Sequence, residues 1–179
     1  MRIIGGKYRS LTLAEFRGDD IRPTADRVKE SLFDIIFRLV PSARILDLFC
    51  GSGGLGLECI SRGSRFVHFN DVSRGSLEVL KKNLKRLKDE SGYKVTNLDF
   101  ADCLHGLSEN FDIIFLDPPY RLTAGAEALE IIASKKLLAA GGVAVLERDV
   151  PFSGEISGLE MYDERKYGKT YLNFFRSVE

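Results

Sequence analysis

The tetrapeptide Asp117-Pro118-Pro119-Tyr120 follows directly on the apolar run 111–116. Proline cannot donate to a sheet ladder and favours an extended backbone, so the sequence predicts that a buried strand ends here. The Asp117 carboxylate and the Pro118 carbonyl oxygen can accept the two hydrogens of a flat amino group, and the Tyr120 ring can stack on the ring that carries it. We interpret these four residues as a catalytic site for the exocyclic amine of a nucleobase. The alternative is a plain strand-ending turn.

A glycine-rich segment supports the first interpretation. Gly51, Gly53 and Gly56 have the G-x-G-x-x-G spacing, between the apolar strand 44–49 and a helix. A strand, a glycine turn and a helix in this order are typical of sites that bind adenosine-containing cofactors. The next apolar strand ends near Asp71, where a carboxylate can accept hydrogen bonds from the two hydroxyls of a ribose.

The position of Asp47 distinguishes between two such cofactors. Asp47 lies within the strand before the glycines. A negative charge there gives no advantage for binding a pyrophosphate, but it attracts the ammonium and sulfonium groups of S-adenosylmethionine. The Asp117 turn also suits methyl transfer to nitrogen, and it has no obvious part in hydride transfer. We therefore predict S-adenosylmethionine, with S-adenosylhomocysteine as product, rather than a nicotinamide dinucleotide.

Further cofactor contacts are expected beyond the third strand. There the Asp99 carboxylate can accept a hydrogen bond from the adenine amine, and the Phe100 ring can pack on the face of adenine. A plain helix cap is the alternative for Asp99. The complete set of predicted cofactor-binding residues is Thr24, Asp47, Phe49, Gly51, Ser52, Gly53, Asp71, Val72, Asp99, Phe100 and Asp117.

These residues can meet only if the strands that carry them end at one edge of a sheet. The apolar pattern predicts strands near 44–49, 65–70, 93–97, 111–116 and 142–147, and helices near 54–62, 74–89, 101–107 and 125–138. Such alternation is typical of a parallel sheet with helices on both faces. Ligands of these sheets bind beyond the carboxyl ends of the strands. We therefore expect the glycine loop, Asp71, Asp99 and Asp117 to converge on one cleft.

The two ends of the chain follow other patterns. Residues 1–42 resemble an appendage that begins with a flexible basic segment, in which 3–4 and 11–13 can pair as strands. A helix follows, which Thr24 can cap and Pro41 ends. Its predicted buried face consists of Val28, Leu32, Ile35, Ile36 and Leu39.

The pattern near the C-terminus predicts an antiparallel hairpin. Its strands span 159–165 and 170–176, and it turns at Tyr167-Gly168-Lys169. We expect Gly141-Gly142 to end the preceding helix and to lead into the fifth strand. The whole chain, 1–179, is expected to be a single domain with its catalytic core at 43–179.

Composition sets broader limits on function. Of the 179 residues, 44% are hydrophobic and 29% are charged, as in ordinary globular proteins. The N-terminus lacks the apolar core of a signal peptide, and no apolar run is long enough to span a membrane. We expect a cytoplasmic monomer that is not bound to a membrane. The three cysteines and two histidines show no metal-ligand spacing, so we predict no metal.

The distribution of charge points to RNA more than the net charge does. The chain has 26 basic and 26 acidic residues, which is not the usual balance of a nucleic-acid-binding protein. Basic residues nevertheless cluster near the N-terminus and at the hairpin, where they can reach phosphates beside the cleft. For Lys7 and Arg9 the alternative is a solvated surface charge, and for Arg22 and Arg27 it is support of the cofactor end of the site. The predicted RNA-binding residues are Lys7, Arg9, Arg22, Arg27, Lys166 and Lys169.

Together these motifs resemble the RsmD family, which methylates the N2 amine of guanine in small-subunit ribosomal RNA. The resemblance is carried by residues 2–9, 22–33, 46–53, 117–120 and 165–175, and so covers nearly the whole chain. One departure concerns Asp71, which is followed by Val72 and Ser73. The family commonly has a longer Glu at this position, with an Asp two residues later.

The resemblance implies an α/β fold, namely the Rossmann-like fold of class I S-adenosylmethionine-dependent methyltransferases. It comprises a mostly parallel seven-stranded sheet with the C-terminal hairpin and the N-terminal appendage. The implied substrate is a guanine of 16S ribosomal RNA, either as free RNA or within an assembling 30S particle. Two alternatives remain open. One is an adenine-N6 methyltransferase acting on DNA or RNA, and the other is a cofactor-binding assembly factor for RNA without catalysis.

Overall fold

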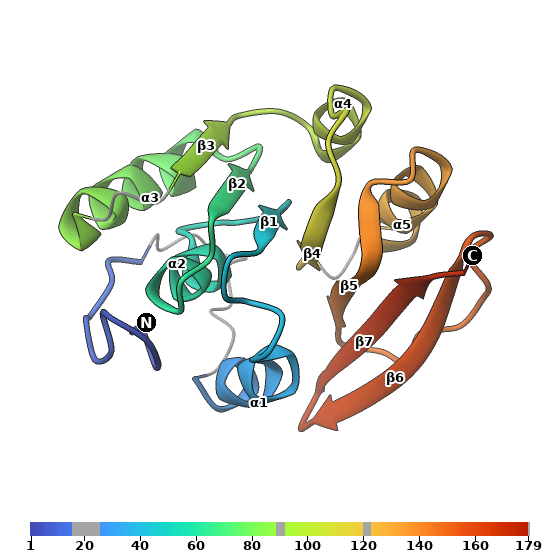
Figure 1. Cartoon of the computed structure of the whole chain (residues 1–179), viewed down its shortest axis with the longest axis horizontal. Helices are drawn as coiled ribbons and strands as arrows, with labels where there is room; N and C mark the ends of the chain where they lie inside the picture. The colour runs from blue at the N-terminus through green and yellow to red at the C-terminus, as the bar shows by residue number, and fades with distance from the viewer. Residues whose placement is uncertain (16–25, 89–91, 120–122, 179) are drawn as a thin grey trace.

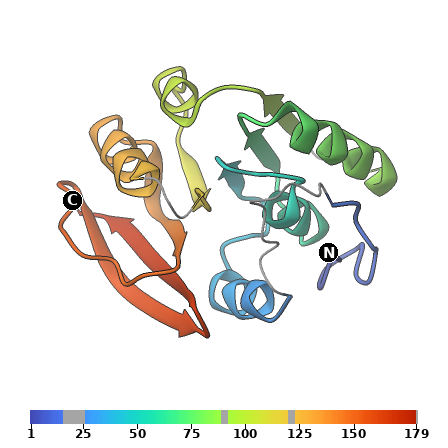
Figure 2. The ribbon, with the colours of Figure 1, turned by 180° about the vertical axis from the view of Figure 1, so that it is seen from behind.

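The computed structural model describes residues 1–15, 26–88, 92–119 and 123–178. Over these residues the chain forms a sheet of seven strands in the spatial order β3-β2-β1-β4-β5-β7-β6 (Figure 1). The helix α3 and the β6–β7 hairpin lie at opposite ends of the molecule in both views (Figure 1, Figure 2).

The strands and helices follow one another much as the sequence predicts. The strands are β1 (Arg44–Asp47), β2 (Phe66–Asn70), β3 (Gly92–Thr96), β4 (Phe111–Leu116), β5 (Leu138–Arg148), β6 (Leu159–Tyr167) and β7 (Thr170–Ser177). The helices are α1 (Asp26–Ile36), α2 (Gly54–Ser61), α3 (Arg74–Leu87), α4 (Phe100–His105) and α5 (Ala124–Ser134).

The strand order gives the sheet a switch point between β1 and β4. Strands β1 to β5 are parallel, and the chain places β2 and β3 on one side of β1 and β4 and β5 on the other. Strand β7 then pairs antiparallel with β5, and β6 pairs antiparallel with β7. The predicted fold class, a mostly parallel seven-stranded sheet with a C-terminal antiparallel hairpin, is confirmed.

Side-chain alternation along the strands separates two apolar cores. Ile45, Phe115 and Val145 face the core that α1, α2 and α3 cover. Their neighbours Leu46 and Leu146 face the core that α4 and α5 cover. The residue that ends each strand can therefore be assigned to a face by counting from these positions.

Helix α1 buries a different face from the predicted one. Val28, Leu32 and Ile36 are buried as expected, but Ile35 is 38% exposed, and Lys29 and Phe33 are buried in its place. Leu39 is likewise 39% exposed, beyond the end of the helix at Ile36. The prediction considered apolar residues only, whereas the buried stripe includes a lysine that has a carboxylate partner elsewhere in the fold.

Strand β5 begins earlier than predicted, and Gly141-Gly142 lies within it. Helix α5 ends at Ser134, and Lys136 then takes a left-handed backbone with φ 53°. The register shifts between the pairs Phe111–Leu138 and Ile113–Val143, which marks a bulge in β5. Gly141, with φ 74°, lies in this bulge, so the glycines serve the strand and do not end the helix.

The N-terminal segment is docked on α2, and the prediction of a flexible segment is wrong. The expected strand pair is reduced to one bridge between Arg2 and Thr12. Lys7 donates its backbone N–H to the Ser61 carbonyl oxygen at 2.7 Å, and the Tyr8 N–H donates to the Ser61 hydroxyl at 2.9 Å. These bonds hold the segment against the last turn of α2.

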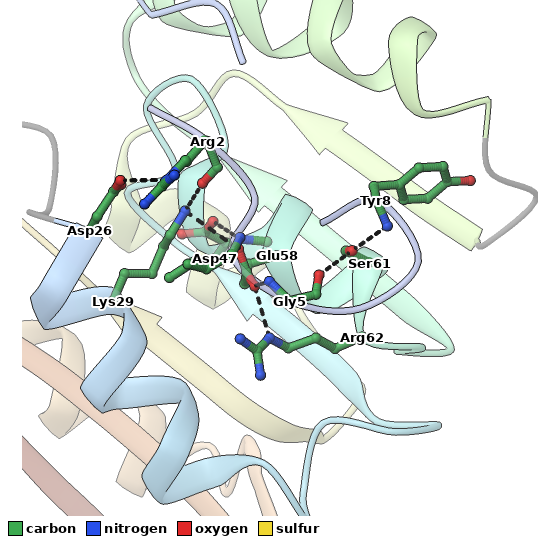
Figure 3. Close-up of polar contacts among 11 residues, drawn as sticks. Arg2, Gly5, Tyr8, Asp26, Lys29, Asp47, Glu58, Ser61 and Arg62 are labelled. Atoms are coloured by element: carbon green, nitrogen blue, oxygen red, sulfur yellow. Dashed lines mark hydrogen bonds and ion pairs between the residues drawn. The ribbon is translucent and has the colours of Figure 1, made fainter. Parts of the chain in front are cut away.

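A buried carboxylate, Glu58 of α2, is the centre of this attachment (Figure 3). Its two oxygens accept hydrogen bonds from the backbone N–H groups of Ile4 at 2.9 Å and Gly5 at 2.8 Å. It also pairs with Arg62 at 2.8 Å and with Lys29 of α1 at 3.4 Å. Glu58 therefore joins the N-terminal segment, α1 and α2 through one side chain.

Lys29 is as deeply buried as its partner, with 1% of its surface exposed. Burial lowers the pKa of the Lys29 ammonium, and the charge of Glu58 opposes that effect. The Lys29 ammonium also donates a hydrogen bond to the Arg2 carbonyl oxygen. An uncompensated charge at this depth would be costly, so the cluster depends on the presence of all its members.

We predict that Glu58→Gln lowers the free energy of unfolding by about 3–5 kcal/mol, because it leaves the Lys29 ammonium buried without a carboxylate. Urea denaturation measures the loss, with Glu155→Gln, a change at an exposed glutamate, as control. A loss below about 1 kcal/mol, the range of an exposed ion pair, would contradict this role.

Candidate active site

The glycine loop after β1 is shaped for close approach of a ligand. Gly51 and Gly53 have φ values of 53° and 92°, a left-handed backbone that favours glycine. The Gly53 N–H closes the turn on the Cys50 carbonyl oxygen at 2.8 Å. A Cβ added to Gly51 would meet no atom within 4 Å, so the space on that side of the loop is open.

Asp47 ends β1 beneath this loop and is 2% exposed. Its carboxylate accepts a hydrogen bond from the Gly56 N–H at 2.9 Å, which fixes the first turn of α2 against the strand. Gly56 itself packs so closely on the Phe69 ring that an added Cβ would lie 2.2 Å from it. Burial raises the pKa of the Asp47 carboxyl to about 7, an effect that the Gly56 bond opposes and the charge of Asp71 increases.

Asp71 follows β2 and links that strand to the glycine loop. One carboxylate oxygen accepts the Gly51 N–H at 2.8 Å, and the other accepts the Ser73 N–H at 2.8 Å. A carboxylate oxygen has two lone pairs, so both can still accept from ribose hydroxyls. The adjacent Val72 is 73% exposed, and its proposed contact with the cofactor remains a prediction.

Asn70 is a supporting residue that the sequence reasoning missed. Its amide donates to the carbonyl oxygens of Leu48 at 3.2 Å and Leu98 at 3.1 Å, and its oxygen accepts from the Thr96 hydroxyl at 2.8 Å. It thereby ties together the ends of β1, β2 and β3. An asparagine at the end of an apolar strand, immediately before Asp71, was the available signal.

The third strand brings Asp99 and Phe100 to the same edge. One Asp99 oxygen accepts the Ala101 N–H at 2.9 Å, so the helix cap expected as the alternative is present. The Phe100 ring lies 5.6 Å from that of Phe49, between ring centroids. Two aromatic residues predicted to bind the cofactor, one after β1 and one after β3, therefore lie next to each other.

Asp117 occupies the turn directly after β4. Burial raises the pKa of its carboxyl well above the ordinary value, and the charges of Glu147, Asp47 and Asp71 raise it further. Pro118 is buried against α5, where a Cβ on Gly125 would lie 3.5 Å from the proline ring. Pro119 is exposed.

Three predicted site residues lie outside the described part of the chain. They are Thr24, Arg22 and Tyr120.

Glu147, near the end of β5, is a second residue that the sequence reasoning missed. It is 7% exposed, and it has the largest effect of any charged group on the pKa of Asp117. Its signal was a glutamate directly after the apolar run 143–146. The edge of the sheet thus has carboxylates at or just after the ends of β2, β1, β4 and β5, in that spatial order.

The basic residues predicted to bind RNA fall into two groups. Lys166 and Lys169 lie at the hairpin turn, which is next to the end of β5 because Tyr171 pairs with Arg148. Lys7 and Arg9 lie instead near Ser61, at the far end of α2 from the glycine loop. A helix of this length places them about 12 Å further from the cleft.

Arg27 is exposed in the first turn of α1. That turn lies toward the glycine-loop end of α2, because Lys29 pairs with Glu58, whereas Phe33, further along α1, packs against Arg62 beyond the end of α2. Among the described residues, no helix is long and apolar enough to cross a membrane. Within the same ranges, no three His, Cys, Asp or Glu side chains are grouped to hold a metal ion.

Known proteins resemble this chain in sequence and in fold. Residues 1–176 match the family model described as "Conserved hypothetical protein 95". The chain is 34% identical to Ribosomal RNA small subunit methyltransferase D of Haemophilus influenzae over 83% of this chain and 79% of the relative. Identity to the Escherichia coli protein of the same name is 33%, over 84% and 75%. The chain belongs to the RsmD family.

A solved structure extends the RsmD likeness to the whole chain. The Escherichia coli protein yhhF has a TM-score of 0.89 and 30% sequence identity, with 99% of this chain and 97% of that chain covered. The resemblance stated from the sequence motifs is therefore confirmed, and so is the enzyme class, a methyltransferase.

The raised pKa of Asp47 leads to a test of the cofactor end of the site. In the unfolded chain this carboxyl titrates near pH 4, so between about pH 4 and pH 7 the folded protein holds a proton that the unfolded chain has lost. Stability must fall as the pH rises through this window. Asp47→Asn keeps an acceptor for the Gly56 N–H, and because asparagine does not ionise, this variant does not lose stability in the same pH range.

We predict that the stability of Asp47→Asn relative to wild type rises between pH 4 and pH 7, by about 4 kcal/mol or less, and is constant above that range. Urea denaturation at several pH values measures it. At pH 7 the variant should also bind S-adenosylmethionine about tenfold or more weakly in calorimetry. A stability difference that does not change with pH would show that Asp47 is not the titrating group.

Proposed function

We propose that the protein transfers a methyl group from S-adenosylmethionine to the exocyclic N2 amine of a guanine in small-subunit ribosomal RNA. The observation that carries this proposal is the position of Asp117, a half-buried carboxylate that directly follows β4 beside the switch point. Relatives that are about one third identical are named for methylation of small-subunit ribosomal RNA, which supports the choice of substrate.

The residues around the glycine loop fit this cofactor. Asp71 can accept hydrogen bonds from the ribose hydroxyls, and the Phe49–Phe100 ring pair can pack against adenine. Asp47 suits a ligand with an ammonium and a sulfonium group, since a cation offsets the cost of ionising a buried carboxyl. When bound, the cofactor supplies an electrophilic methyl group. Thr24, Ser52, Gly53, Val72 and Asp99 are the further proposed contacts.

Asp117 and the Pro118 carbonyl oxygen hold the target amine. The lone pair of that nitrogen is delocalised into the base, so the amine is a weak nucleophile. By accepting its two hydrogens, these oxygens draw the nitrogen toward tetrahedral geometry and direct its lone pair, and positioning then does most of the work. The methylated nitrogen briefly carries a positive charge and loses a proton to Asp117 or to water. The raised pKa of Asp117 makes its carboxylate a better acceptor for that proton.

The target guanine must leave its stack to reach Asp117, which costs a few kcal/mol. Stacking on Tyr120, within the proposed site, can return about 1–3 kcal/mol. Free RNA and an assembling 30S particle both remain possible substrates, and either would place the enzyme in the cytoplasm as the sequence suggests. We propose that it acts as a monomer.

We predict that ribosomal RNA from cells lacking the gene has lost one N2-methylguanosine, which mass spectrometry of nucleosides detects. The wild-type gene should restore it. Asp117→Ala should not, although its affinity for S-adenosylmethionine should be nearly unchanged, because that carboxylate faces the amine. The appearance of N6-methyladenosine instead would favour the adenine methyltransferase, and no change in either nucleoside would favour a non-catalytic assembly factor.

The basic residues give a second test. We propose that Lys166, Lys169 and Arg27 contact RNA phosphates beside the cleft, and that Arg22, Lys7 and Arg9 contribute further contacts. The first two are supported most directly, because the hairpin turn adjoins the end of β5.

We predict that Lys166→Ala with Lys169→Ala raises the KM for the RNA substrate and reduces the log–log salt slope by about 0.7–0.9 per lost contact. The matched pair Lys7→Ala with Arg9→Ala should change both quantities less, since these residues lie further from the cleft. Affinity for S-adenosylmethionine serves as the control and should stay constant. An unchanged KM and salt slope in the hairpin variant would remove the hairpin from the RNA-binding surface.

A further inference from the structure

Glu147 lies beside Asp117 at the edge of the sheet. Leu116 of β4 and Leu146 of β5 are partners in the parallel register. Asp117 and Glu147 are the next residues of these two strands, and adjacent strands are about 4.8 Å apart. Glu147 is 7% exposed and lies at the same edge of the sheet as Asp117.

Both carboxylates also belong to the same face of the sheet. Leu116 and Leu146 point into the core that α4 and α5 cover, so the residue after each of them turns to the other face. The pairing of Glu147 with Leu172, which lies in the core on that other face, agrees with this assignment. The effect of Glu147 on the pKa of Asp117 is a further sign that the two are close.

The strand order separates the two ends of the cleft. Asp47 and Asp71, the proposed cofactor contacts, follow β1 and β2 on one side of the switch point. Asp117 follows β4 on the other side, and Glu147 lies one strand further from the cofactor. A group that contacts both Asp117 and Glu147 is therefore part of the methyl acceptor and not of the cofactor.

A pair of carboxylates selects for a particular edge of a base, because an ionised carboxylate only accepts hydrogen bonds. Guanine presents two donor groups side by side, the N2 amine and the N1–H. Adenine presents its N6 amine beside N1, which has a lone pair and no hydrogen. A second carboxylate next to Asp117 thus gains a hydrogen bond from guanine and meets a lone pair on adenine.

We propose that Glu147 determines the specificity of the methyl acceptor by accepting the N1–H of guanine while Asp117 holds the N2 amine. This inference rests on the proposed function, and it names a residue that distinguishes guanine from adenine at the same site. The Asp-Pro-Pro-Tyr turn suits either amine. Glu147 distinguishes guanine from adenine because it contacts N1, the ring atom next to the amine.

The base 2-aminopurine separates the two contacts, since it keeps the C2 amine but has a bare N1. The substrate is small-subunit ribosomal RNA in which a ligated synthetic segment carries either guanine or 2-aminopurine at the modified position. It is used both as free RNA and in reconstituted subunits. Single-turnover rates are measured for both bases. Wild-type enzyme should prefer guanine by about 100-fold or more, because a carboxylate that faces a bare N1 meets a lone pair there and gains no hydrogen bond.

Glu147→Gln should reduce the ratio of the guanine rate to the 2-aminopurine rate about tenfold or more, because the glutamine amide can donate a hydrogen bond to a bare N1. Glu147→Asp, which keeps the acceptor, should preserve the preference within about threefold even if both rates fall. Glu130→Gln, a change at an exposed glutamate on α5, is the matched control and should behave as wild type.

The outcomes separate this inference from the function on which it rests. If wild-type enzyme does not methylate the guanine substrate, the proposed function fails. If it does, and Glu147→Gln slows both bases by the same factor, Glu147 has a structural role only and the inference is overturned. If Glu147→Asp and Glu147→Gln reduce the preference for guanine by the same factor, the inference is also overturned. The preference would then depend on the shape of the side chain and not on its hydrogen bonding.

Discussion

The parallel sheet forces its strand ends to a common edge, and in this protein several of those ends are carboxylates. Asp47, Asp71, Asp117 and Glu147 come from strands that are neighbours in space, and the negative charges of their neighbours raise the pKa of Asp47 and of Asp117. Such an edge is unfavourable for folding but suited to ligands rich in positive charge and hydrogen-bond donors. A cationic cofactor and an amine-bearing base are ligands of this kind. Binding of such ligands offsets the cost of ionising these carboxylates, and this effect favours the complex.

In the middle of α2, by contrast, positively charged groups surround a buried carboxylate. Glu58 is fully buried, but it is surrounded by an ammonium, a guanidinium and two backbone N–H groups. These groups offset the charge of Glu58, so the cluster holds the N-terminal segment and α1 in fixed positions (Figure 3). Asn83 adds a second attachment by bonding both Ala14 and the Ser52 carbonyl oxygen of the glycine loop. The appendage is thus tied to the glycine loop of the proposed cofactor site.

The two halves of the proposed site are built by different means. Around the glycine loop, backbone geometry and short hydrogen bonds define the shape, as the bond between Gly51 and Asp71 illustrates. Beyond β4, shape depends on tertiary packing of Pro118 against α5 and on the register between β4 and β5. The first end is formed largely by residues within one β–α–β unit. The second requires two strands whose contact residues are some thirty positions apart in the chain.

The sequence by itself determined the order of strands and helices, because apolar periodicity and glycine spacing are local signals. From that order it predicted that the glycine loop, Asp71, Asp99 and Asp117 lie at one edge of the sheet. It did not identify the role of Lys29 or Glu147. A charged residue becomes a buried member of a cluster only when a distant segment supplies its partner, and local patterns contain no information on that pairing. For the same reason the N-terminal segment was expected to be flexible. Only the tertiary structure decided its position, since the bonds that hold it are to Glu58 and Ser61, more than fifty residues away.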